Sequence, residues 1–110
     1  MKKKILIFGG SGFVGINLSK YLAKKNYNVV STYMSKKPKS IRKVKFVKFD
    51  LMSNTFDIKI FNNVETVFVC SANSSGAKIM TNNPASHFED NLIMNLNLVK
   101  NLEFSSIKKI

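Results

Sequence analysis

The chain of 110 residues contains no tryptophan, two prolines and one cysteine, Cys70. A single cysteine cannot form an internal disulfide, and low cysteine use is typical of the reducing cytoplasm, so we expect a cytoplasmic protein. Long apolar runs are also missing. The run Ile5 to Phe8, which follows the initial lysines, ends at a glycine and is too short for a signal peptide or a membrane helix. We therefore expect no membrane partner.

Acidic residues are scarce, because 18 Lys and Arg stand against 6 Asp and Glu and none of the acids precedes Asp50. The formal net charge of +12 would attract nucleic acid, an anionic membrane or an anionic cofactor. The aromatic-rich strand pattern of RNA-binding sheets does not accompany these charges. We interpret most of the lysines as solvated surface residues and expect no nucleic-acid partner.

The apolar content of 45% supports a core, and the apolar residues occur in alternating strand and helix patterns. The strand patterns lie at 4–9, 27–33, 44–49, 65–70 and, as a beginning only, 107–110. Helix patterns lie at 12–26 and 84–104, with a weak helix or turn at 54–63. This order predicts an α/β fold, a Rossmann-type doubly wound parallel sheet truncated after four strands and the start of a fifth. We expect residues 1–110 to be the N-terminal part of such a domain.

Each helix pattern carries an apolar stripe that we expect to face the core. The stripe of the first helix consists of Val14, Leu18, Tyr21 and Leu22. The stripe of the second helix consists of Phe88, Leu92, Leu96, Val99 and Leu102. The alternative is that part of the second stripe forms an interface between two copies of the chain, as in a homodimer.

The segment GGSGFVG, residues 9–15, joins the first strand pattern to the first helix pattern. Its glycines fit two registers, GxGxxG from Gly10 and GxxGxxG from Gly9, which share Gly12 and Gly15. In such a turn one glycine makes the bend, one lets a pyrophosphate approach, and one lets the helix pack closely. The helix N-terminus then faces the anion. A turn without a ligand is the alternative, but the position between strand and helix favours a phosphate site.

An acidic residue that binds the ribose 2′-hydroxyl of NAD would fall near Tyr33 in this kind of fold. The residues there include Ser35 and Lys36, and no acid is within reach. A cation at this place suits the 2′-phosphate of NADP, so Ser35 and Lys36 are candidate cofactor-binding residues. An ordinary basic loop in an NAD-binding protein is the alternative. The sequence favours NADP and leaves NAD open.

Four segments together resemble the extended short-chain dehydrogenase/reductase family, which contains nucleotide-sugar epimerases, dehydratases and reductases. They are ILIFGGSGFVGINLSKYL, VKFVKFDL, TVFVCSAN and NPASHFEDNLIMNLNLVKN. The resemblance covers the chain but only about the first third of a full member, and it favours the register that starts at Gly9. Residues 74–99 look most like the GDP-fucose synthase branch, which reduces and epimerises a GDP-keto-sugar with NADPH.

The resemblance implies contacts to NADP or NAD from four places. The turn and the helix start would hold the pyrophosphate through Gly9, Gly12, Phe13, Val14 and Gly15. Asp50, beside Leu51, would accept a hydrogen bond from the adenine amino group. The end of the fourth strand would line the ribose and nicotinamide with Ser71, Ala72 and Asn73. Asn91 would reach the cofactor from the second helix. Alternatively, Asp50 is a turn residue and Asn91 a helix residue packed on the sheet.

Catalysis in the family needs a Tyr-x-x-x-Lys pair on a later helix and a Ser or Thr after the fifth strand. The pairs Tyr21/Lys25 and Tyr33/Lys37 have this spacing but fall on the first helix and near the adenosine, so we interpret both as decoys. We predict no catalytic residue and no metal site. The chain would be the cofactor-binding portion of an enzyme that transfers hydride on a nucleotide-linked sugar, and it would be inactive alone. The alternative is a non-catalytic dinucleotide-binding or sensing module with a protein partner.

Overall fold

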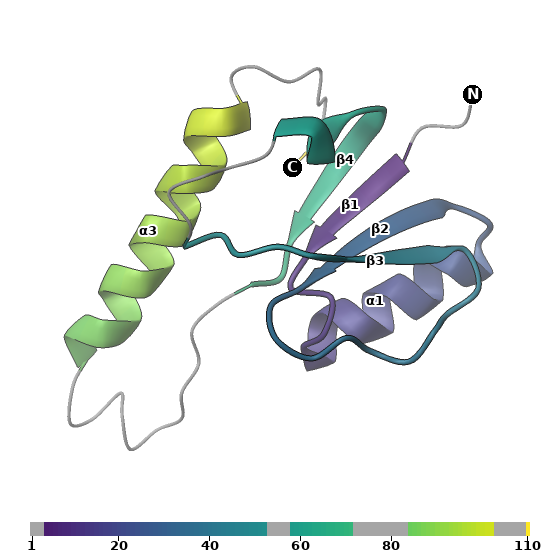
Figure 1. Cartoon of the computed structure of the whole chain (residues 1–110), viewed down its shortest axis with the longest axis horizontal. Helices are drawn as coiled ribbons and strands as arrows, with labels where there is room; N and C mark the ends of the chain where they lie inside the picture. The colour runs from purple at the N-terminus through teal and green to yellow at the C-terminus, as the bar shows by residue number, and fades with distance from the viewer. Residues whose placement is uncertain (1–3, 53–57, 72–83, 103–109) are drawn as a thin grey trace.

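A computed structural model of the chain describes residues 4–52, 58–71, 84–102 and 110. The elements are the strands β1 (Lys4–Phe8), β2 (Asn28–Tyr33), β3 (Val44–Lys48) and β4 (Val64–Val69), the helices α1 (Phe13–Lys24) and α3 (Pro84–Leu102), and the short 3-10 helix η1 (Ile58–Phe61). The strands form one parallel sheet in the order β3-β2-β1-β4 (Figure 1). This arrangement confirms the predicted Rossmann-type α/β fold. The start of the predicted strand at 107–110 lies outside the described residues.

Alternate residues of β1 contact the two helices on opposite faces of the sheet (Figure 1). Leu6 and Phe8 belong to the core cluster that also contains Leu98 of α3. Ile5 and Ile7 point to the other face and pack with Leu22 of α1. The sheet is therefore covered on both sides, as the period of two along a strand requires.

The phenyl ring of Phe8 is fully buried and forms the centre of the larger cluster. Its centroid lies 5.7 Å from that of Phe49 and 6.3 Å from that of Phe61, with the rings edge to face. Aromatic pairs in this geometry contribute about 0.5–1.5 kcal/mol beyond the burial of their area. Phe49 follows β3 and Phe61 ends η1, so these contacts fix two connecting segments on the sheet.

The outer strands differ in how far they are covered. β3 is at an edge of the sheet, as its alternation of apolar and basic residues predicts. The apolar run of β4 predicts a buried strand, and Val64 and Val67 are buried. Phe68 and Val69, however, are 37% and 39% exposed, because β4 forms the other edge of the described sheet.

The predicted apolar stripe of α1 is wrong in two of its four residues. Leu22 is buried and Leu18 packs on the smaller cluster, but Val14 is 63% exposed and Tyr21 58% exposed. The buried positions of α1 are Gly15, Ser19, Leu22 and Ala23. Small residues decide the orientation of this helix, because its first turn must approach the backbone of the preceding loop.

The predicted stripe of α3 is also rotated away from the sheet. Leu98 is buried and Met94 packs against the core, which places this i, i+4 pair on the inner face. Leu92, Leu96 and Val99 are 44%, 50% and 56% exposed, so the prediction that they lie in the core is wrong. The side chains of Phe88 and Leu102 lie outside the described residues. In the described part of the chain, no helix combines the length and the apolar character needed to cross a membrane.

Candidate functional site

The glycine turn begins with Gly9, which follows β1 and has a φ of +84°. Its backbone N–H donates a hydrogen bond of 3.1 Å to Thr32 Oγ1 at the end of β2. A Cβ on Gly9 would lie 2.7 Å from the backbone nitrogen of Ser71 and 2.8 Å from the carbonyl carbon of Cys70. Both the left-handed backbone and the close approach of the segment after β4 therefore require glycine here.

The glycines at positions 10 and 15 pack the turn against its neighbours. A Cβ on Gly15 would overlap the carbonyl oxygen of Gly9, so glycine allows α1 to begin directly against the turn. A Cβ on Gly10 would overlap Ser31 Oγ of β2, and the Gly10 N–H donates to the Thr32 carbonyl oxygen at 2.7 Å. The sequence assigned Gly10 only to an alternative register, whereas the structure gives it this packing role.

Two buried serines complete the packing below the turn. Ser19 Oγ donates to the Gly15 carbonyl oxygen at 2.8 Å and lies 3.0 Å from Ser31 Oγ. Both serines are fully buried. Their small hydroxyl side chains allow α1 to lie close to β2 while each polar atom keeps a hydrogen-bond partner.

Gly12 is different, because neighbouring atoms leave room for a side chain. Among the described residues, a Cβ on Gly12 would meet one atom within 4 Å, the Gly9 carbonyl oxygen at 3.6 Å, which is ordinary contact. Gly12 is the N-cap of α1 and makes no side-chain cap, and the first turn contains no acidic residue. The open space beside Gly12 therefore lies at the N-terminus of α1, which is an electrostatically favourable place for an anion.

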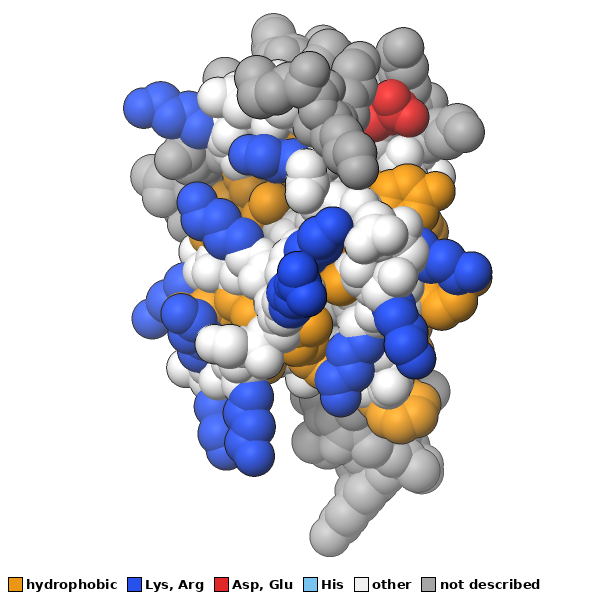
Figure 2. Space-filling view, turned by 90° about the vertical axis from the view of Figure 1, so that its right-hand side faces the viewer, with side chains coloured by type: hydrophobic (Ala, Val, Ile, Leu, Met, Phe, Trp, Pro, Cys, Tyr) orange, Lys and Arg blue, Asp and Glu red, His pale blue; other side chains and the backbone are white. Residues whose placement is uncertain are grey.

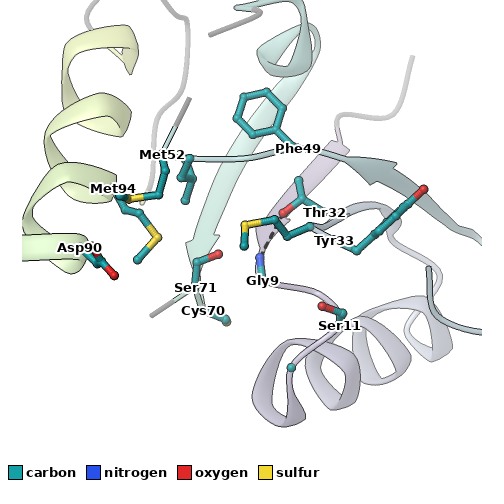
Figure 3. A pocket seen from close by; sticks show the side chains of 13 residues that line it. Gly9, Ser11, Thr32, Tyr33, Phe49, Met52, Cys70, Ser71, Asp90 and Met94 are labelled. Atoms are coloured by element: carbon teal, nitrogen blue, oxygen red, sulfur yellow. Dashed lines mark hydrogen bonds between the residues drawn. The ribbon is translucent and has the colours of Figure 1, made fainter. Parts of the chain in front are cut away.

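A cavity of about 440 Å³ opens beside Gly12 at the carboxyl edge of the sheet (Figure 3). Its walls come from the turn, the ends of β2, β3 and β4, and one side of α3. The lining residues are Gly9, Ser11, Gly12, Thr32, Tyr33, Met34, Phe49, Leu51, Met52, Cys70, Ser71, Asp90 and Met94. Its position is where open α/β sheets bind their ligands, and its size suits a small molecule or part of one.

Several predicted cofactor residues come together around this cavity. Gly9, Gly12, Leu51 and Ser71 line it. The start of α1 is formed by Phe13, Val14 and Gly15. The side chains of Phe13 and Val14 are exposed, so we expect these residues to contact a cofactor through their backbone N–H groups. Ala72 and Asn73 lie outside the described residues.

Other predicted residues lie next to the lining rather than in it. Asp50 is exposed, and its Oδ1 accepts a 2.9 Å hydrogen bond from the Met52 N–H, which is the turn role stated as the alternative. Ser35 and Lys36 are exposed and follow Met34, a lining residue. Asn91 is half-buried on α3, whereas its neighbour Asp90 and Met94 line the cavity.

Apart from Leu51, the sequence did not indicate the apolar wall, which consists of Met34, Phe49, Leu51, Met52 and Met94. The apolar residues Phe49 and Leu51 on either side of Asp50 could have indicated this wall. Neighbouring side chains of an extended segment point to opposite sides, so both turn inward when the Asp50 carboxylate is exposed. The cavity also contains Cys70, whose thiol pKa is raised by burial. This thiol is protonated at neutral pH and is a weak nucleophile.

One hydrogen bond joins two walls of the cavity. Asn97 Nδ2 of α3 donates to the carbonyl oxygen of Leu51, 46 residues earlier in the chain. The contact holds α3 against the segment that follows β3. Asn97 was not recognised from the sequence, because a single asparagine in a helix has no distinctive spacing.

The two Tyr-x-x-x-Lys pairs have separate positions. On α1, Tyr21 is mostly exposed, and Lys25 Nζ lies 5.7 Å from the centroid of its ring. Tyr33 is half-buried in the cavity wall at the end of β2, and Lys37 is exposed in the following loop.

The sequence profile of the NAD dependent epimerase/dehydratase family matches residues 5–110. The chain belongs to this family. No curated protein matches the chain significantly in sequence. The family assignment agrees with the glycine turn and with the position of the cavity.

Solved structures share the fold. UDP-glucose 4-epimerase of Thermotoga maritima, solved with UDP-glucose, is 24% identical with a TM-score of 0.78, and the match covers 96% of this chain and 35% of that one. UDP-glucuronic acid 4-epimerase of Bacillus cereus, in complex with UDP-glucuronic acid and NAD, is 20% identical with a TM-score of 0.77, covering 96% and 38%. An epimerase of Methanothermobacter thermautotrophicus is 23% identical with a TM-score of 0.74, covering 96% and 33%. The chain thus spans about a third of the length of these proteins.

Proposed function

We propose that this chain is the NAD(P)-binding N-terminal portion of an enzyme that acts on a nucleotide-linked sugar. The observation that carries the proposal is Gly12. Packing within the described protein requires glycine at positions 9, 10 and 15, but it leaves room for a Cβ at Gly12. A glycine there is explained by a ligand that must come close to the backbone, and the uncapped start of α1 makes that ligand an anion.

The residues around the cavity fit the parts of a dinucleotide. The glycine turn and the first turn of α1 would hold the pyrophosphate. The apolar wall around Phe49 and Leu51 would bury the adenine ring, and Ser71 would offer its hydroxyl on the ribose and nicotinamide side. When bound, the nicotinamide supplies hydride exchange. The residues of this chain bind and orient the cofactor and exclude water from its apolar parts.

We further propose that NADP is preferred to NAD, with NAD as the competing cofactor that the family description names. Tyr33 and Met34, at the end of β2, lie in the cavity wall. None of the described residues at this place is an acid that could bind a ribose 2′-hydroxyl. Ser35 and Lys36 follow directly and are exposed, so they can reach a 2′-phosphate. Titrating NADPH and NADH separately tests this preference, and tighter binding of NADH would overturn it.

The chemistry on the sugar is assigned to groups outside this chain. A tyrosine that exchanges a proton needs its lysine partner beside the nicotinamide, whereas Tyr21 lies on the exposed side of α1. The proposed substrate class is a nucleotide-linked sugar, and the resemblance of residues 74–99 to GDP-fucose synthases favours a GDP-linked keto-sugar. Assays of an intact enzyme that contains this chain, using GDP-linked and UDP-linked sugars, would separate the two substrate classes.

Calorimetric titration of NADPH into the chain and into its Gly12→Ala variant tests cofactor binding directly. The variant should fold normally, because the added Cβ meets only ordinary contact. Its affinity for NADPH should fall at least tenfold, since the methyl group occupies the space of the pyrophosphate. Equal affinity of the two proteins, or no saturable binding by the parent chain, would contradict the proposed function.

A further inference from the structure

A second concave surface lies at the opposite end of α1 from the glycine turn. It has a volume of about 400 Å³ and is lined by Lys20, Ala23, Lys24, Asn26, Ile41, Arg42 and Lys43, a set that we term the basic groove. We propose that the basic groove binds a small anion that carries several phosphate groups. Figure 2 looks at this end of the molecule and shows Lys and Arg side chains gathered across it, with acidic side chains visible only at its upper rim.

The groove is built by two segments, the end of α1 and the turn that precedes β3. The Val44 N–H donates to the Ile41 carbonyl oxygen at 3.1 Å and closes a turn with Arg42 and Lys43 at its corner. Lys43 has a φ of +69°, and its Nζ donates a 3.1 Å hydrogen bond to Asn26 Oδ1 at the end of α1. A non-glycine residue keeps such a backbone conformation only where its surroundings fix it. The corner is therefore a defined structure that holds cations beside α1.

The charge of the groove is of one sign. Its lining contains four cationic side chains, and none of the described lining residues is acidic. The C-terminus of α1 favours a cation at Lys24 through the helix dipole, and Lys43 has its hydrogen bond to Asn26. Neither the helix dipole nor a hydrogen bond to Asn26 explains the positions of Lys20 and Arg42. Four like charges around one concavity repel one another, and a multivalent anion would remove that repulsion.

A neighbouring depression of about 310 Å³ extends the positive surface. It shares Lys43 with the basic groove and adds Lys4 and Lys45 at the beginnings of β1 and β3. None of the described residues that line either depression is aromatic. Single-stranded nucleic acids are usually bound with aromatic stacking, and a flat membrane does not fill a concavity. Arginine binds phosphate oxygens through two parallel N–H groups. These features favour a compact polyphosphate chain.

The basic groove is separate from the proposed cofactor site. Lys20, the lining residue nearest to the glycine turn, is seven residues after Phe13, which corresponds to about 10 Å along a helix, and none of the described residues lines both cavities. This separation is close to the Debye length of roughly 8 Å at physiological ionic strength, so the two sites are separate in contact but only partly screened from each other. Because the two sites have no described lining residue in common, a substitution in one leaves the contacts of the other in place, and each proposal can fail alone.

Isothermal titration with tripolyphosphate at 150 mM salt tests the proposal, using the double variant Lys20→Gln and Arg42→Gln. A matched control carries Lys48→Gln and Lys100→Gln, which remove the same charge from exposed positions elsewhere. The parent chain should bind tripolyphosphate saturably, and more tightly than orthophosphate. The groove variant should lose at least tenfold in affinity and the control less than threefold, while thermal melting shows that both are folded.

Three results would overturn the proposal. The first is that the parent chain does not bind tripolyphosphate saturably, or that the matched control loses as much affinity as the groove variant. An equal loss would mean that net charge alone determines the affinity. The second is loss of tripolyphosphate binding in Gly12→Ala, because the anion would then occupy the glycine turn. The third is tighter binding of a ten-nucleotide single strand than of tripolyphosphate, lost in the groove variant, which would make this surface a nucleic-acid site. NADPH affinity of the groove variant, expected to equal that of the parent, reports on the proposed function separately.

Discussion

Thr32 at the end of β2 fixes the conformation of Gly9 at the end of β1, because its Oγ1 accepts the hydrogen bond of the Gly9 N–H at 3.1 Å. Thr32 is 3% exposed, so water cannot easily replace the acceptor. Replacement by valine keeps the shape but leaves the N–H unsatisfied, which should cost about 1–3 kcal/mol in the free energy of unfolding. Urea denaturation measures this cost. Thr32→Ser retains the hydroxyl and should recover most of the stability, and equal losses in both variants would contradict the role of the hydrogen bond.

Glycines in the same turn should respond differently to alanine. In Gly15→Ala the new Cβ overlaps the carbonyl oxygen of Gly9, so α1 must shift and stability should fall by about 1–3 kcal/mol or more. In Gly12→Ser the hydroxyl can cap the helix, and stability should change by only a few tenths of a kcal/mol. Thermal melting of the two variants checks this difference. If Gly12→Ser were as destabilising as Gly15→Ala, the space beside Gly12 would not be free.

Much of this fold follows from local patterns. The first four strand runs, the glycine turn between strand and helix, and the long helix that begins at Pro84 were predicted within a few residues of their observed bounds. The faces of the helices that turn toward the core were not predicted correctly. Spacing suggested Tyr21 and Leu96 as core residues, yet both are at least half exposed. The cause is tertiary, because the approach of Gly15 to Gly9 sets the rotation of α1, and no pattern within the helix records that contact.

The candidate site shows the same division between local and tertiary information. The glycine turn was recognised from consecutive residues, since a motif fixes its own backbone geometry, and the role of the end of β4 was implied by the family resemblance alone. Met94 and Asn97 were missed, because their positions in the site depend on how α3 lies against the segment after β3. Asp50 was assigned to adenine, a role that stays a prediction. The structure shows its side chain bound to the Met52 N–H.

Cys70 should react with iodoacetamide more slowly than an exposed thiol at every pH below its raised pKa. Burial disfavours the thiolate, so the folded protein binds the proton more tightly than the unfolded chain does. The contribution of Cys70 to stability is therefore fully present below the ordinary thiol pKa and is lost as pH rises through the raised value. Alkylation rates followed by mass spectrometry from pH 7 to 10 check the prediction. A rate that equals that of urea-unfolded protein at pH 8 would refute it.

The hydrogen bond from Asn97 to the Leu51 carbonyl oxygen should determine how firmly α3 closes the cavity. Asn97→Ala removes the donor across two elements that are distant in sequence, and we expect a loss of about 1–2 kcal/mol in unfolding free energy. Asn95→Ala is the matched control, since Asn95 is exposed on the same helix and has the same change in helix propensity. Hydrogen exchange should show faster opening of α3 in Asn97→Ala, with protection of β1 nearly unchanged. Equal exchange of α3 amides in the two variants would mean that packing of Met94 and Leu98, and not this hydrogen bond, holds the helix in place.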